Sequence, residues 1–219
     1  MQREKIISTL LDMAGRYSSY EVFSDWIRCM ALTISNSLCM THDKLWHDRE
    51  KAFLDTYGKY TKDEQTMFSE MFAWLAESLD NGPDDVLGSV YMMSGMGSKA
   101  AGQFFTPFHL AEMTARTGLE DSIKSLREEM TTLPIYEPAC GGGAMIIAAA
   151  KVLRDEGVNY QRVMRVTAQD LDWKGVYMCY VQLSLLGINA VCIQGNTLDG
   201  RSAERRQKLF TPAWMGALV

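Results

Sequence analysis

The first half of the chain repeats apolar positions with the period of an α-helix. Between Met67 and Leu79 the apolar residues recur at i, i+1, i+4, i+5, i+8 and i+12, which places them on one stripe of a helix. Thr61 and Glu64 have the spacing of a capping box at its start, and Asn81-Gly82-Pro83 predicts its end. The stripe consists of Met67, Phe68, Met71, Phe72, Leu75 and Leu79.

A second apolar stripe, further towards the N-terminus, predicts another helix. Such methionine and aromatic side chains can form a ligand box, but a core between packed helices is their more common fate. The same interpretation applies to Trp46 and Phe53. We therefore predict a helical domain over residues 1–96. The second stripe consists of Val22, Phe23, Trp26, Ile27, Met30 and Ile34.

From about residue 133 the pattern changes to short apolar runs, tight turns and helices. This βαβαβ alternation predicts a parallel sheet with helices on its faces, in an α/β domain over residues 97–219. Gly95 to Lys99 is the predicted hinge between the two domains. In chain order we predict a strand at 133–137, a helix through Met145, Ile146, Ile147 and Val152, a strand at 162–170, a helix at about 174–186 ending at Gly187, and a strand at 190–193.

Composition narrows the classes of function. With a formal charge of -5 and a pI of about 5.3, the chain has no bulk positive field, so any DNA contact must be local or come from a partner. The five cysteines include no C-x-x-C pair and no histidine at zinc-ligand spacing, which predicts free thiols and no metal site. No apolar run approaches the roughly 20 residues that span a bilayer. We expect a cytoplasmic protein that does not enter a membrane.

The strongest local signal is Glu137-Pro138-Ala139-Cys140-Gly141-Gly142-Gly143, at a predicted strand-to-helix turn. Glycines there let a ligand approach the backbone, and the next helix offers unpaired N–H groups. Asp170 follows Gly143 by 27 residues and ends the second strand, where its carboxylate can accept hydrogen bonds from both hydroxyls of a ribose. The residues alone leave two interpretations open: a nucleoside-cofactor site, or a tight turn with Asp170 capping the next helix.

Three elements in this order resemble a known family. They are Gly102-Gln103-Phe104-Phe105-Thr106-Pro107, the 137–143 segment and Gln169-Asp170. Together they resemble the N6-adenine DNA methylases, above all the modification subunits of type I restriction systems. Asp85 to Tyr91 also resembles the segment that precedes the first element in those proteins. The resemblance extends from about residue 84 to 198. It implies a partial Rossmann-like S-adenosylmethionine-dependent methyltransferase sheet behind a helical domain.

The resemblance implies which residues bind S-adenosylmethionine. Phe105, Thr106 and Pro107 match the element that closes over the methionine part of the cofactor. Asp170 matches the acid that binds the ribose, and Leu171 matches the neighbour that packs on adenine. The loop around the amino-acid and ribose portions is matched by Glu137, Pro138, Ala139, Cys140, Gly141 and Gly143.

A further family element departs from the pattern in this chain. The family places Gly-Asp-Thr/Ser-Leu after the third strand and uses its Asp on the adenine amino group, whereas this chain has Gly195-Asn196-Thr197-Leu198. The side-chain carbonyl of Asn196 can accept the same hydrogen bond without charge assistance. Asn196, Thr197 and Leu198 are therefore predicted cofactor contacts, with weaker binding than an aspartate would give.

The catalytic tetrapeptide of the family is missing. Adenine methylases use Asp/Asn/Ser-Pro-Pro-Tyr/Phe to hold the target amino group and to stack on the flipped base. This sequence contains no Pro-Pro pair, and Thr211-Pro212-Ala213-Trp214 is the nearest substitute. We therefore predict no catalytic residue. The chain ends 21 residues after Leu198, so we expect a fragment or a reduced relative, and Met1 favours a short natural protein of the kind that mobile elements carry.

Three functions remain open at this point. The first is an adenine-specific DNA methyltransferase of a restriction-modification system. The second is an inactive S-adenosylmethionine-binding module, or a partner of a methyltransferase or specificity subunit, which the missing tetrapeptide favours. The third is a methyltransferase for small molecules or proteins, which the 102–107 element argues against. A basic cluster near the end can contact phosphate or form a solvated helix face. This cluster consists of Arg201, Arg205, Arg206 and Lys208.

Overall fold

The computed structural model describes residues 1–96, 105–129, 131–199 and 207–216. Its N-terminal part is helical, as predicted. The helix expected from the 67–79 stripe is α4, and the capping box between Thr61 and Glu64 is present. The second stripe lies on α2, which Ser18 and Glu21 cap in the same way. The helices of this part are α1 (Gln2–Asp12), α2 (Ser19–Ser37), α3 (Lys44–Tyr57), α4 (Lys62–Asp80) and α5 (Val86–Met93).

The apolar stripes of α2 and α4 form a core between helices, which confirms that interpretation. Trp26 is almost fully buried, and its indole N–H donates to the carbonyl of Phe68 on α4 at 3.1 Å. Phe53 is partly buried and packs against the same core. Trp46 is half-buried on α3, where its ring stacks on His42 with a centroid distance of 4.1 Å.

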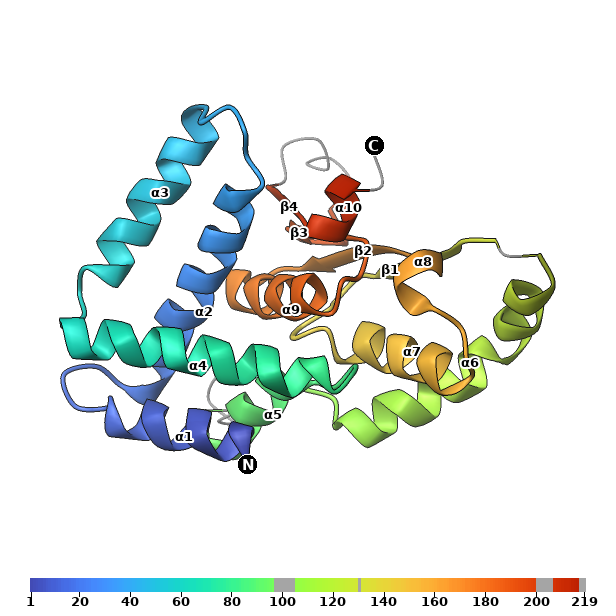
Figure 1. Ribbon diagram of the computed structural model, residues 1–219, viewed down its shortest axis with the longest axis horizontal. Helices are drawn as coiled ribbons and strands as arrows, with labels where there is room; N and C mark the ends of the chain where they lie inside the picture. Colours follow the sequence, from blue (N-terminus) through green and yellow to red (C-terminus); the bar gives the residue numbers. More distant parts are fainter. Residues whose placement is uncertain (97–104, 130, 200–206, 217–219) are drawn as a thin grey trace.

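The rest of the described chain is an α/β structure. Its sheet has the strand order β1-β2-β3-β4, with the first three strands parallel (Figure 1). The predicted βαβαβ unit and fold class are confirmed. The elements are α6 (Phe108–Glu129), β1 (Leu133–Glu137), α7 (Ala144–Asp155), α8 (Tyr160–Val163), β2 (Met164–Asp170), α9 (Trp173–Leu185), β3 (Ala190–Gln194), β4 (Lys208–Phe210) and α10 (Pro212–Gly216).

Two elements differ from the sequence prediction. The strand expected at 162–170 begins at Met164, because Asn159 caps a short helical turn by accepting a hydrogen bond from the Arg162 N–H. The short strand β4 was not predicted, and it pairs antiparallel with β3. Three residues give too short an alternation for a strand to be recognised.

The helical region packs against the sheet through α9. Figure 1 shows α2 between α3 and α9, and α2 contacts both of these helices. The buried apolar residues form one cluster that continues from α1, α2 and α4 into α7, α9 and the strands. This arrangement places α2 and α5 beside the carboxyl end of β2, where α9 begins. All five cysteines are free thiols. None of the helices in the described ranges has the length and hydropathy needed to cross a bilayer.

Candidate cofactor-binding site

The glycine loop forms the turn from β1 into α7. Gly141 and Gly143 adopt φ angles of 49° and 95°, in the left-handed region where glycine is strongly favoured. The Gly143 N–H donates to the carbonyl of Cys140 at 2.7 Å. A Cβ atom on Gly143 would lie 3.1 Å from the Sγ atom of Cys179, on α9. The turn therefore requires glycine for its backbone angles and also for the close approach of α9.

Asp170 ends β2 directly beside this loop. Its Oδ2 accepts a hydrogen bond from the Gly141 N–H at 2.8 Å, and its Oδ1 accepts one from the Asp172 N–H at 2.9 Å. An ionised carboxylate has about four acceptor positions, so both oxygens can still accept hydroxyl groups of a ribose. The interpretation that Asp170 caps the next helix is wrong, because Asp172 caps α9 by accepting from the Lys174 N–H.

A cavity of about 260 Å³ opens between the glycine loop, β2 and the start of α9. A Cβ atom on Gly141 would lie 2.9 Å from the ring of Phe105, so this ring covers the loop closely. Met145 and Gly175 also line the cavity and were not predicted. A Cβ atom on Gly175 would lie 3.3 Å from Cα of Gly141, a close approach that no sequence motif marks. Of the predicted residues, the cavity brings together Phe105, Thr106, Ala139, Cys140, Gly141 and Asp170.

The loop after β3 lies next to this cavity. The Thr197 hydroxyl donates to the carbonyl of Pro138 at 2.6 Å, which ties the two loops together. Leu171 and Leu198 are 67% and 95% exposed. The Oδ1 atom of Asn196 accepts the Leu198 N–H at 2.9 Å and so stabilises its own turn. The predicted residues that do not line the cavity are Pro107, Glu137, Pro138, Gly143, Leu171, Asn196, Thr197 and Leu198.

Phe105 is supported from behind by α5. Its ring packs edge-to-face on Tyr91, with a centroid distance of 5.1 Å. The Lys174 ammonium donates to the Tyr91 hydroxyl at 3.1 Å and to the Tyr20 hydroxyl at 3.3 Å. Burial alone would lower the pKa of Lys174, but the hydrogen bonds with Tyr91 and Tyr20 outweigh it, and the net pKa is raised. Lys174 therefore stays charged and links α2, α5 and α9 behind the aromatic wall of the cavity.

A buried polar network supports the glycine loop. The Gln182 amide group donates to Oδ1 of Asp85 and to the carbonyl of Gly142, both at 2.9 Å. Its carbonyl oxygen accepts the Leu87 N–H at 3.0 Å. Burial raises the pKa of Asp85, while its hydrogen bonds with Gln182 and Gly88 oppose that shift. The segment that begins α5 is thus joined to the loop through one side chain of α9.

Replacing Gln182 with leucine is expected to destabilise the fold by at least about 3 kcal/mol. The change leaves the Leu87 N–H, the Asp85 carboxyl and the Gly142 carbonyl without this partner, at about 1–3 kcal/mol for each buried group. Urea unfolding measures the effect. Gln161→Leu is the matched control, because Gln161 is exposed and the Leu186 carbonyl that it contacts also accepts from Tyr160. Equal stabilities of the two variants would contradict a supporting role for Gln182.

Thr211, the first residue of the nearest substitute for the missing tetrapeptide, lies away from the glycine loop. Thr211 is fully buried, and its hydroxyl donates to the carbonyl of Ile188 at 2.7 Å while accepting the Ala190 N–H at 3.0 Å. These partners lie at the beginning of β3, whereas the glycine loop and Asp170 lie at the carboxyl ends of β1 and β2. Because β4 runs antiparallel to β3, Thr211 lies at the end of the sheet where the parallel strands begin, opposite their carboxyl ends.

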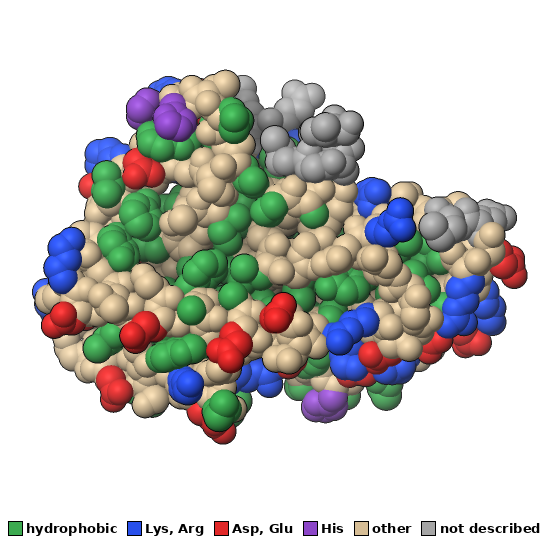
Figure 2. Space-filling model, in the orientation of Figure 1, with side chains coloured by type: hydrophobic (Ala, Val, Ile, Leu, Met, Phe, Trp, Pro, Cys, Tyr) green, Lys and Arg blue, Asp and Glu red, His purple; other side chains and the backbone are tan. Residues whose placement is uncertain are grey.

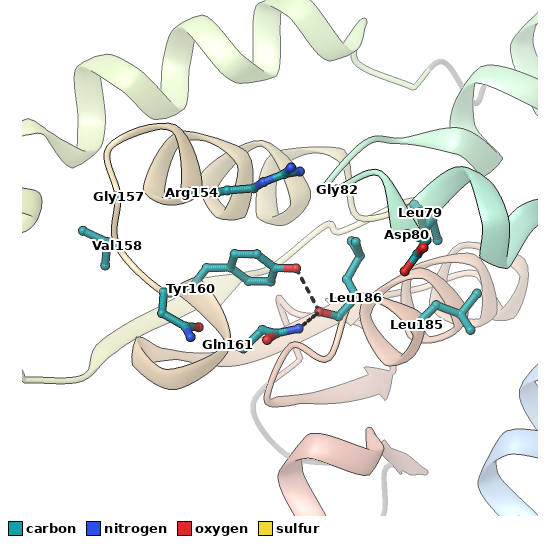
Figure 3. A pocket seen from close by; sticks show the side chains of 11 residues that line it. Leu79, Asp80, Gly82, Arg154, Gly157, Val158, Tyr160, Gln161, Leu185 and Leu186 are labelled. Carbon is teal, nitrogen blue, oxygen red and sulfur yellow. Dashed lines mark hydrogen bonds between the residues drawn. The ribbon is translucent and has the colours of Figure 1, made fainter.

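A larger cavity of about 480 Å³ lies at the end of the sheet where the parallel strands begin, between the ends of α4, α7 and α9 (Figure 3). Three of its polar side chains are already used in the fold. The Tyr160 hydroxyl and the Gln161 amide both donate to the Leu186 carbonyl, as Figure 3 shows. Arg154 donates to the carbonyl of Asn81. A ligand site needs polar groups directed at the ligand, so the smaller cavity is the better candidate.

A parallel sheet with a glycine turn after its first strand and an acid at the end of its second is typical of α/β domains that bind nucleotide cofactors. Comparison with known proteins gives the family. The profile of the family described as N-6 DNA Methylase matches residues 83–210, more than half of the chain. The chain therefore belongs to the N-6 DNA methylase family, which confirms the resemblance found in the sequence.

One solved structure is also similar in shape. It is described as a putative class I S-adenosylmethionine-dependent methyltransferase from Listeria monocytogenes, with a TM-score of 0.49 and 10% sequence identity. The alignment covers 91% of this chain and 55% of the other, so the chain spans about half the length of that protein. No curated protein shows significant similarity to the chain. Within the described ranges, no group of histidine, cysteine and acidic side chains could hold a metal ion.

Proposed function

We propose that the chain binds S-adenosylmethionine at the glycine loop. Methyl transfer to N6 of adenine in DNA then follows in a complex with a partner subunit. The observation that carries the proposal is the position of Asp170. Its carboxylate holds the Gly141 turn and also lines the cavity. In nucleotide-binding α/β domains, an acid at this position binds the ribose hydroxyls.

The residues present fit the parts of this cofactor. The cavity of about 260 Å³ is near the lower end of the roughly 300–1,000 Å³ that ligand clefts occupy, so it would hold part of the cofactor. The methionine part would lie between Phe105 and the loop, and the ribose at Asp170. The adenine would lie on the exposed Leu171 side chain, beside the turn of Asn196. When bound, S-adenosylmethionine supplies an electrophilic methyl group on a sulfonium.

The proposal includes a partner because no residue described so far is assigned to binding DNA or to positioning the target base. The formal charge of -5 gives no general attraction for DNA. On the face shown in Figure 2, acidic and basic side chains of the described residues are interspersed. The partner would be a methyltransferase or specificity subunit that brings the target adenine to the site.

A second candidate is a module that binds S-adenosylmethionine without catalysing transfer. The burial of Thr211 favours it, because the nearest substitute for the catalytic tetrapeptide is a structural element of the sheet. Both candidates need the cofactor. They differ in whether a partner restores methyl transfer.

Isothermal titration calorimetry with S-adenosylmethionine and S-adenosylhomocysteine tests the shared premise. We expect saturable binding of both ligands with a dissociation constant in the micromolar range, about -8 kcal/mol. NAD is the control ligand, because it also carries an adenosine but lacks the methionine part. Absence of heat with both ligands at high micromolar concentration, or equal binding of NAD, would contradict the proposed cofactor.

A further inference from the structure

A further cavity lies on the other side of α9, away from the glycine loop. It has a volume of about 570 Å³ and is enclosed by α2, α3, the first turns of α9 and β4. The proposed function does not use this cavity. The side chains that give it chemical character are Arg28, Arg49, Lys208, Trp173, Tyr177 and Phe210.

Three cations border this cavity without a protein partner. Within the described residues, Arg28, Arg49 and Lys208 form no ion pair and donate no side-chain hydrogen bond. Asp48 also lines the cavity, but its carboxylate is paired with Lys44 at 2.6 Å. Lys208 belongs to the basic cluster found in the sequence. The other members of that cluster, Arg201, Arg205 and Arg206, lie outside the described residues.

The two arginines lie close to Tyr177, one of the aromatic side chains that line the cavity. Burial raises the pKa of Tyr177, and the positive charges of Arg28 and Arg49 oppose that shift. Both guanidinium groups are therefore within electrostatic reach of the Tyr177 ring. In a chain with a net charge of -5, unpaired arginines gathered at one cavity favour an anionic ligand.

The wall itself is a pair of stacked rings. Trp173 and Tyr177 lie one helical turn apart on α9, with a centroid distance of 4.9 Å and an angle of 26° between the ring planes. Both side chains are only half-buried, as is Phe210 on β4. Partly exposed aromatic rings beside arginines are the combination that binds nucleic-acid bases and their phosphates.

The position of the wall relates it to the cofactor cavity. Trp173 is the first residue of α9, and Gly175, in the same turn, lines the cavity at Asp170. The two cavities thus lie on different sides of one helical turn, next to the carboxyl end of β2.

We propose that this cavity between α2, α3, α9 and β4 binds a phosphorylated nucleotide, with the base on the Trp173 and Tyr177 rings and the phosphate at Arg28 and Arg49. The shared chemistry is a planar base joined to a phosphate. The nucleotide is either free or one unit of a single DNA strand, since the bases of an intact duplex cannot reach an aromatic wall.

Fluorescence anisotropy with an end-labelled DNA strand of about 12 nucleotides tests the proposal, within the range of lengths that single-strand sites cover. The unlabelled competitors are dAMP and a duplex of the same sequence. The test variant is the double substitution Arg28→Ala with Arg49→Ala. The matched control is Arg162→Ala, because Arg162 is an exposed arginine on α8, directly before β2 begins. Circular dichroism checks that each variant is folded.

We expect the double variant to bind the strand at least about tenfold more weakly than the parent. The slope of log binding constant against log salt concentration should also become shallower, by about 0.7 for each phosphate contact that is lost. Arg162→Ala should bind as the parent does. If dAMP displaces the labelled strand, a free nucleotide is a sufficient ligand. If the strand stays bound in the presence of dAMP, the ligand is single-stranded DNA. No binding of strand or dAMP at millimolar concentration, equal binding by the duplex, or equal losses in both variants would overturn the proposal. Calorimetry with S-adenosylmethionine on the double variant should be unchanged, so this test is independent of the proposed cofactor.

Discussion

Asp170→Ala is expected to weaken S-adenosylmethionine binding by about 1.5–3 kcal/mol, which is roughly a tenfold to hundredfold increase in dissociation constant. The substitution removes the charged acceptor proposed for the ribose hydroxyls. It also leaves the Gly141 N–H without its acceptor, so the glycine turn loses the contact that fixes it beside β2. Calorimetry on the purified, folded variant measures the effect.

Asp172→Ala is the matched control for this prediction. Asp172 lies two residues further along and caps α9, so its loss should cost about 0.5–2 kcal/mol of stability. Its carboxylate does not line the cofactor cavity. The two variants should therefore separate: Asp170→Ala loses affinity, whereas Asp172→Ala loses stability and keeps an affinity within about twofold of the parent. An Asp170→Ala protein that binds as tightly as the parent would refute the assignment of the ribose acid.

The parts of the site that the sequence predicts are those with a local backbone requirement. Gly141 and Gly143 adopt positive φ angles, and such turns need glycine wherever they occur, so the sequence marks them directly. Asp170 is found because strand and turn patterns place it at the end of β2. The apolar stripe of α4 is found for a similar reason, since its period is set by the helix itself.

The contacts that support the site are not visible in the sequence, because they join residues far apart in the chain. Asp85 and Gln182 meet across 97 positions, and nothing in the pattern of either segment indicates the other. Gly175 is needed because Gly141 comes within 3.3 Å of its missing Cβ, which only the packing of α9 on the loop reveals. Thr211 begins a tetrapeptide that loosely matches the family motif in sequence. Because β4 reverses the chain direction, Thr211 lies at the opposite end of the strands from the glycine loop.

The chain by itself is expected to methylate DNA at no measurable rate, even with S-adenosylmethionine bound. Transfer needs the adenine amino group held in line with the methyl sulfonium, at near-attack distance. The tetrapeptide that does this in the family is missing, and Thr211 is held at the beginning of β3 by Ile188 and Ala190. Losing such orientation removes about 7–11 kcal/mol of barrier lowering, or at least about five decades in rate.

The measurement is transfer of tritium from labelled S-adenosylmethionine to mixed genomic DNA, with and without extracts that could supply a partner. Asp170→Ala is the control that ties any label to the glycine-loop site. Label on DNA from the pure chain, lost in Asp170→Ala, would contradict the prediction and require a positioning group other than Thr211. Label only in the presence of extract, again lost in Asp170→Ala, would support an enzyme divided between two chains. If calorimetry shows cofactor binding and neither reaction labels DNA, the cofactor-binding module without catalysis is the function that remains, because the site would then lack only the group that orients the base.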